Sequence, residues 1–152
     1  MKQGVLYCIS NKIWDNVFKI GSTCDIKKRI SCIQTSLYED CVIECQTNNL
    51  KCINFFEHIV KHIILKNYKL RKDREFYKIE VANAQQIFET FNIINEQMSE
   101  EQIIEYMRIY LPDYYKRQKK VILSNKKNIV EKKLKKRKRI YVDIQNEKIY
   151  YV

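Results

Sequence analysis

The chain has 152 residues, of which 45% are apolar and 31% are charged, and its formal net charge is +11. This composition supports one folded domain with an appendage and excludes a wholly disordered or collagen-like chain. No apolar run approaches the roughly 18 residues of a transmembrane helix, and the first 14 residues lack the features of a secretory signal. We therefore expect an intracellular protein that is neither secreted nor held in a membrane.

The N-terminal part of the chain predicts a β-hairpin. Residues 4–10 alternate as a strand does, and a turn-rich stretch separates them from a second strand at 17–20. Asp25 is placed to cap a helix that reaches about residue 37, because its carboxylate can accept an N–H of the first turn. Residues 40–45 alternate enough to form a third strand.

The middle of the chain predicts a second helix over about residues 51–66. Asn54 and Glu57 have capping-box spacing near its start. A helical wheel places a broad apolar stripe on one face, made of Ile53, Phe56, Val60, Ile63 and Ile64.

Further elements follow in the second half. Residues 75–81 predict a strand, and residues 84–95 and 100–110 predict two helices. Ser99 and Gln102 form a capping box for the last of these, which should end at Pro112. We expect domain limits at 1–98, 99–115, 116–139 and 140–152, with a helical basic segment at 116–139 and strand-like alternation after it.

Only two glycines occur, and each marks a motif. The first is Gly4-Val5-Leu6-Tyr7, and the second is Phe18-Lys19-Ile20-Gly21-Ser22-Thr23; Arg29 follows on the first predicted helix. Together with Glu57 on a later helix and the run Glu75-Phe76-Tyr77, these motifs resemble the GIY-YIG nuclease superfamily. The resemblance covers about residues 3–80 and is closest to the phage and large-virus branch of Orf172-type DNA-binding proteins.

The resemblance implies an α/β (α+β) fold, with a small central antiparallel sheet flanked by helices and a basic C-terminal helical extension. It implies a metal-dependent DNA endonuclease in which Tyr7 positions or deprotonates the attacking water. Arg29 would steady the scissile phosphate, and Glu57 would hold one divalent metal, Mg²⁺ or Mn²⁺. Gly21 would let the backbone approach the site.

One position departs from the pattern of that superfamily. Lys19 stands where many active members have a second tyrosine. A lysine ammonium is charged at neutral pH, so it cannot act as a base there, but it can hold a phosphate electrostatically. A catalytically inactive DNA-binding module with the same fold is therefore the alternative function.

The residue types agree with phosphodiester hydrolysis, which needs a positioned water, a cation on the developing negative charge and a metal as Lewis acid. Arg29 and Glu57 lie just beyond the apolar stripes of their helices, where they can reach a shared site. The alternative is that Tyr7 is a core tyrosine, Arg29 a surface charge and Glu57 a capping acid.

A second motif has the spacing of a zinc finger, with Cys41 and Cys45 followed by His58 and His62. The aromatic residue that such a finger places four residues after the second cysteine is Asn49 here. The two histidines also lie opposite the apolar stripe of their helix. We therefore do not expect zinc, and we interpret the histidines as a solvated face.

The excess positive charge lies in residues 116–139, which carry 13 basic side chains and one acidic one, whereas residues 1–115 carry 15 of each. Such a segment favours DNA as a partner over a membrane surface or a solvated helix without a partner. The run 132–139 also suits a nuclear-import signal, so cytoplasm, nucleus and viral factory all remain open as locations. The candidate DNA-binding side chains are Lys27, Lys28, Lys119, Lys120, Lys126, Lys127, Lys132, Lys133, Lys135, Lys136, Arg137, Lys138 and Arg139.

Overall fold

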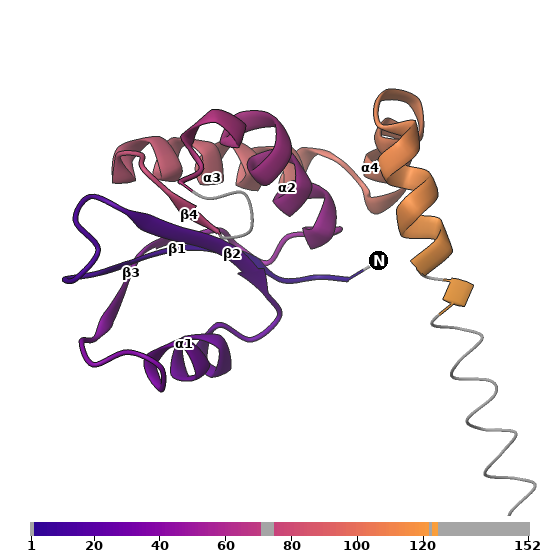
Figure 1. Cartoon of the computed structure of the whole chain (residues 1–152). Helices are drawn as coiled ribbons and strands as arrows, with labels where there is room; N and C mark the ends of the chain where they lie inside the picture. Colours follow the sequence, from indigo (N-terminus) through magenta and orange to yellow (C-terminus); the bar gives the residue numbers. More distant parts are fainter. Residues whose placement is uncertain (1, 71–74, 122, 125–152) are drawn as a thin grey trace, which may run out of the picture. The chain divides into compact units, whose positions relative to one another are not determined.

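The structure is a computed structural model that describes residues 2–70, 75–121 and 123–124. The chain divides into two compact units, residues 1–105 and 106–152. The first unit contains the sheet (Figure 1). Every candidate catalytic residue lies within its residue range.

The sheet of the first unit is antiparallel throughout, as predicted. It contains β1 (Val5–Asn11), β2 (Phe18–Thr23), β3 (Cys41–Gln46) and β4 (Phe76–Tyr77), in the order β3-β1-β2-β4. The expected hairpin is formed by β1 and β2, in which Tyr7 lies opposite Gly21. The chain is therefore an α+β protein with a small central sheet, in agreement with the predicted fold class.

The central strand β1 is buried on both faces. Leu6, Tyr7, Cys8 and Ile9 have no exposed surface. Figure 1 shows why: α1 (Ile26–Gln34) lies on one side of the sheet, and α2 (Ile53–Ile59) and α3 (Val81–Gln97) lie on the other. Burial of both faces explains a run of apolar side chains that is nearly continuous rather than strictly alternating.

Helix α1 begins as predicted and ends earlier than predicted. The Asp25 carboxylate accepts the Lys28 N–H at 3.0 Å and so caps the first turn. The helix stops at Gln34 instead of continuing to about residue 37. Thr35 and Ser36 donate their hydroxyl groups to the carbonyls of Cys32 and Ile33, which satisfies the last turn locally and favours termination.

The second predicted helix is not a single α-helix. After α2, the backbone widens into a π-helical turn, η1 (Val60–Ile64), and then tightens into a 3₁₀ turn, η2 (Lys66–Tyr68). The Leu65 N–H donates to the Val60 carbonyl at 2.8 Å, five residues back. This wide turn brings Leu65 into the core (3% exposed) and leaves Ile63 53% and Ile64 38% exposed, so the predicted stripe is wrong at its C-terminal end.

The predicted capping box of α2 is also wrong. The residue before the helix is Cys52, which has φ 53° and makes no side-chain cap. The Glu57 carboxylate instead accepts a hydrogen bond from the Lys61 ammonium group, one turn further along. This contact places Glu57 in a charged cluster rather than at a helix end.

The predicted strand at 75–81 is reduced to the two residues of β4, and α3 begins at Val81, before the predicted start. Helix α3 buries Ala84, Phe88 and Phe91 along one face, and its Asn95 side chain accepts the Lys51 N–H at 2.7 Å. The packed face lies within the predicted range, and the helix extends three residues before it and two residues after it.

The capping box of α4 (Glu100–Tyr110) is confirmed. The Ser99 N–H donates to the Gln102 side chain at 2.7 Å, and the Gln102 N–H donates to the Ser99 hydroxyl at 3.2 Å. Leu111 is not helical, and Pro112 opens a further helical stretch, 112–121, a position that suits proline because its missing N–H is not needed there.

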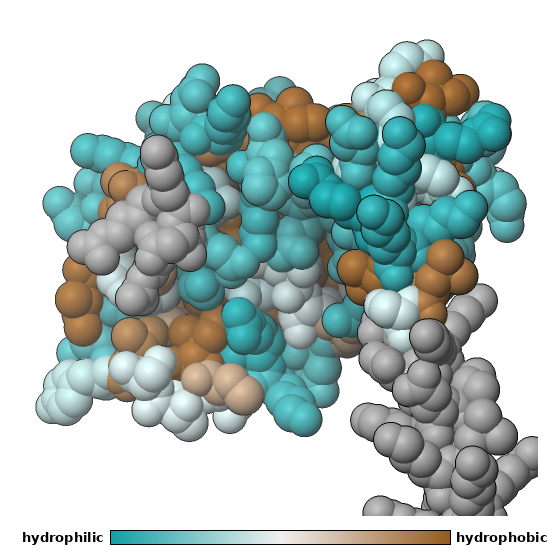
Figure 2. Space-filling view, turned by 45° about the vertical axis from the view of Figure 1, so that its right-hand side comes forward, coloured by the Kyte–Doolittle hydropathy of each residue, from teal (hydrophilic) through white to brown (hydrophobic). Residues whose placement is uncertain are grey.

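The described part of the predicted basic helix, residues 116–121 and 123–124, is helical. The rest of that segment, including Lys126 to Arg139, and the predicted strand at 140–152 lie outside the described residues. Within the described ranges, no helix combines the length and the apolar character needed to cross a bilayer. The face seen in Figure 2 carries mostly hydrophilic side chains, with apolar ones in small groups.

Candidate functional site

A buried tyrosine and a helix arginine form the first part of the site. Tyr7 extends from β1 toward α1, where the Arg29 Nε donates a hydrogen bond to the Tyr7 hydroxyl at 3.0 Å. Burial raises the pKa of Tyr7, and the Arg29 guanidinium opposes that rise only in part. Tyr7 is therefore a neutral phenol at neutral pH, able to donate its proton in a hydrogen bond to an oxygen.

Because Gly21 has no side chain, the Tyr7 hydroxyl can lie directly against it. A Cβ atom at Gly21 would stand 2.6 Å from that hydroxyl oxygen and 3.3 Å from Oε2 of Glu75. Its φ is not positive, so this glycine is required by close approach and not by backbone conformation. The close approach is that of a tyrosine ring and a carboxylate.

A chain of ion pairs forms the second part of the site. The Lys61 ammonium group bridges two carboxylates. Its Nζ lies 2.7 Å from Oε1 of Glu57 and makes a shorter contact with Oε1 of Glu75. Glu75 also accepts from Lys19, whose Nζ lies 3.4 Å from Oε2. The backbone holds Glu75 in place, since its carbonyl accepts the Ile20 N–H at 3.1 Å at the start of β4.

These contacts set the protonation states of the cluster. Burial raises the pKa of Glu75, but Lys61 and Lys19 together outweigh it and leave the pKa below its ordinary value. Burial lowers the pKa of Lys61, and Glu57 and Glu75 reverse that effect and raise it. Glu75 and Lys61 are thus held in their charged forms near pH 7. By formal charge, the three basic side chains of Lys19, Lys61 and Arg29 exceed the two carboxylates by one positive charge, which suits an anion.

Two carboxylates are the candidate ligands for a divalent cation. Glu57 and Glu75 converge on one cation, and Mg²⁺ is commonly held by one or two carboxylates with water completing its shell. The Tyr77 hydroxyl nearby is fully buried and has no hydrogen-bond partner among the described residues. A divalent cation at these carboxylates would compete with the Lys61 ammonium group for the same oxygens.

The structure brings together the candidate catalytic residues that the sequence singled out. Tyr7 contacts both Gly21 and Arg29, and Lys19 and Glu57 join them through Glu75 and Lys61. Lys61 was not predicted, although its position four residues after Glu57 on a helix is a usable signal for an ion pair. Glu75 was noted only as a motif residue, because nothing local indicates a partner 56 residues away.

The residues of the zinc-finger spacing lie on different elements. Cys41 and Cys45 belong to β3, where Cys45 lies opposite Cys8 of β1. His58 and His62 stack on each other with ring centroids 4.7 Å apart. Among the described residues, no three potential metal-ligating side chains of cysteine, histidine, aspartate or glutamate form a group.

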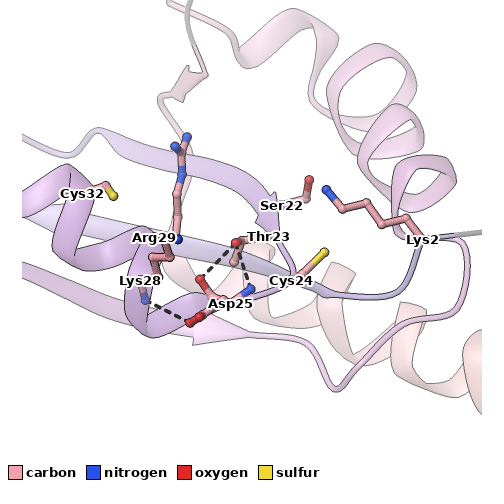
Figure 3. Close-up of a pocket in the computed structure, with 8 residues that line it drawn as sticks. All are labelled: Lys2, Ser22, Thr23, Cys24, Asp25, Lys28, Arg29 and Cys32. Carbon is pink, nitrogen blue, oxygen red and sulfur yellow. Dashed lines mark hydrogen bonds between the residues drawn. The ribbon is translucent and has the colours of Figure 1, made fainter. Parts of the chain in front are cut away.

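A hollow of about 340 Å³ adjoins the site at the start of α1 (Figure 3). Arg29 belongs to both, since it lines the hollow and bonds Tyr7. The hollow is lined by Lys2, Ser22, Thr23, Cys24, Asp25, Lys28, Arg29 and Cys32.

Comparison with known proteins identifies the first unit. The profile of the T5orf172 domain matches residues 4–92, which run from β1 into α3 and include every residue of the site described above. No curated protein and no solved structure matches the chain significantly. Because the match spans more than half of the chain, the protein belongs to the T5orf172 domain family, a phage-associated family of nuclease-like or DNA-binding modules.

Proposed function

We propose that this protein is a metal-dependent DNA endonuclease of GIY-YIG type. The observation that carries the proposal is the hydrogen bond from Arg29 to Tyr7, beside the two carboxylates that converge on Lys61. A cation, a neutral phenol and a pair of carboxylates are the groups that phosphodiester hydrolysis uses. Their arrangement at one end of the sheet supports a reaction on a single phosphate.

In this proposal Arg29 binds the scissile phosphate through its guanidinium group. Its side chain is only half-buried, so it can turn from Tyr7 toward an incoming phosphate. The Tyr7 hydroxyl, enclosed in the structure, would then be free to orient the attacking water. Because burial raises its pKa, Tyr7 acts by hydrogen bonding to the water and is a poor base at neutral pH.

Lys19 and Lys61 have an electrostatic role in this proposal. Both side chains are largely shielded from solvent, with 16% exposure each, so their charges are screened less than those of fully exposed lysines. Glu57 and Glu75 would hold Mg²⁺ or Mn²⁺. When bound, such a cation supplies Lewis acidity to the phosphate and neutralises the developing charge.

A DNA-binding module without catalysis is the second candidate, and specific observations favour it. Lys61 neutralises both carboxylates that a metal would need, and Lys19 replaces the second tyrosine of many active relatives. The Tyr7 hydroxyl is also enclosed, since the residue has no exposed surface. In this reading the same cations hold the DNA backbone and no bond is broken.

Cleavage of supercoiled plasmid with Mg²⁺ or Mn²⁺ separates the two candidates. Wild type should nick or linearise the plasmid only with metal, and Glu57→Gln should abolish cleavage while it retains DNA binding. Glu89→Ala, which removes an exposed acid from α3, is the matched control and should cut like wild type. If no metal supports cleavage and wild type and Glu57→Gln retard DNA equally, the endonuclease proposal fails and the binding module stands.

A further inference from the structure

The hollow beside α1 carries more positive than negative charge. Lys2, Lys28 and Arg29 line it, against the single carboxylate of Asp25. That carboxylate is already engaged, because it accepts the Lys28 backbone N–H at 3.0 Å as the helix cap. No carboxylate among the described residues pairs with any of the three cations. These cations therefore favour an anion in the hollow. The N–H groups at the start of α1 are not needed for this, because the Asp25 carboxylate already caps them.

Hydrogen-bond donors are also present on the wall of the hollow. The Thr23 hydroxyl already makes two hydrogen bonds within the protein, since it accepts the Asp25 N–H at 3.1 Å and donates to the Asp25 carbonyl. The Ser22 hydroxyl makes no hydrogen bond within the described part of the chain. In Figure 3 it points toward the end of the Lys2 side chain. Serine hydroxyls and lysine ammonium groups are both donors to phosphate oxygens in protein–DNA contacts.

The position of the hollow relates it to the Tyr7 site. Ser22 and Thr23 directly follow Gly21 along β2, so the hollow begins one residue beyond the point where the Tyr7 hydroxyl lies. Two residues of strand span about 6–7 Å. Arg29 belongs to both places, since it lines the hollow and donates to the Tyr7 hydroxyl. A DNA strand with one phosphate at Arg29 would thus bring a neighbouring phosphate to Lys2 and Lys28.

We propose that this hollow binds a second phosphate of the DNA backbone, next to the one at Arg29, through Lys2, Lys28 and the Ser22 hydroxyl. The proposal rests on DNA as the substrate, as in the proposed function, but it does not require cleavage. The contact is with the backbone, so it positions the strand in the site and carries no base preference.

Two exposed thiols allow a direct test, because Cys24 and Cys32 line the hollow. The full chain is treated with N-ethylmaleimide in EDTA, with and without a 20-base-pair duplex, and modification is followed by mass spectrometry. DNA should slow modification of Cys24 and Cys32 severalfold relative to Cys41 of β3. If all three thiols react at the same rate with and without duplex, the proposal is wrong.

Charge removal provides the second arm. Lys2→Ala/Lys28→Ala should lower the magnitude of the slope of log K against log salt by about 0.9, the change expected for the loss of one phosphate contact. It should also remove the protection of both thiols. The control, Lys12→Ala/Lys66→Ala, removes two exposed lysines outside the hollow and should keep the wild-type slope and protection. A slope equal to that of the control would overturn the proposal.

The third arm distinguishes backbone phosphate from free phosphate. Inorganic phosphate at matched ionic strength should protect the thiols much less than duplex does; protection by inorganic phosphate alone would overturn the assignment to DNA. Failures of the two proposals are separable. If DNA protects the thiols but is not cleaved, the endonuclease proposal fails and the phosphate-site proposal stands. If Lys2→Ala/Lys28→Ala cleaves normally with an unchanged KM, only the phosphate-site proposal fails.

Discussion

Tyr7 and Gly21 lie opposite each other on β1 and β2, and the tyrosine hydroxyl fills the space that a side chain at Gly21 would need. A Cβ there would stand 2.6 Å from the hydroxyl oxygen and 2.8 Å from Cζ of the ring. The ring is buried in the central strand and cannot move aside freely. The two residues therefore form one structural unit, in which the glycine sets the place of the tyrosine.

We expect Gly21→Ala to destabilise the protein by about 1–3 kcal/mol, because the added methyl group overlaps the Tyr7 ring. Chemical denaturation of both proteins measures this loss. Tyr7→Phe in the Gly21→Ala background should recover part of it, since the closest contact is with the hydroxyl oxygen. Full additivity of the two substitutions would show that the methyl group is accommodated elsewhere.

The Lys61 ammonium group should compete with a divalent cation. Replacing it by glutamine removes the positive charge between Glu57 and Glu75, so Lys61→Gln should raise the affinity for Mn²⁺ and lower stability without metal. Thermal melts with increasing Mn²⁺ measure both effects, and a metal at 100 times its Kd adds about 2.7 kcal/mol. Lys66→Gln is the control. An identical response to Mn²⁺ in Lys61→Gln and wild type would argue against a metal site at these carboxylates.

Glu75 should make stability depend on acid pH. Its pKa is lower in the folded protein than the ordinary value of 4.5, so folding gains stability above about pH 4.5 and loses it as the pH falls through the lowered value. Glu75→Gln should flatten the dependence of unfolding free energy on pH in this range. It should also reduce stability at pH 7, because Lys19 and Lys61 lose their shared partner. Denaturation from pH 3 to 7 tests the expectation, and parallel curves for the two proteins would contradict it.

The basic segment should supply most of the non-specific affinity for DNA. If about half of its 13 basic side chains contact phosphates, the full chain should show a log–log salt slope of about −6. A chain truncated after Tyr115 should fold, as judged by circular dichroism, and bind DNA with a much shallower slope. Failure of the truncated chain to fold would instead assign the C-terminal residues to the core.

The parts of the fold that local patterns determine could be predicted from the sequence. The hairpin, the Asp25 cap and the Ser99–Gln102 capping box each depend on residues a few positions apart, and all three are present. The site was predicted less completely. Tyr7, Gly21 and Arg29 came from an ordered set of motifs, but the bridge from Lys19 to Glu75 joins residues 56 positions apart and has no local signal.

The wide turn at Val60–Ile64 escaped prediction for a different reason. The periodicity of an α-helix assigns Ile64 to the core, and no residue type marks a bond between positions five apart. The shortness of β4 escaped in a similar way, because alternation over residues 75–81 continues past the two residues that pair with β2. In both cases the backbone conformation is determined by tertiary packing rather than by the local preference of the residues.

The wide turn has a consequence for how the sequence of this segment can vary. Val60 and Leu65 both face the core, one turn apart, although five positions separate them. A chain one residue shorter here could place the same two apolar side chains with an ordinary α-turn, so the core alone does not require the additional residue. Alignments that assume uniform spacing between Glu57 and Glu75 would therefore misplace Glu75 in any relative that lacks this residue.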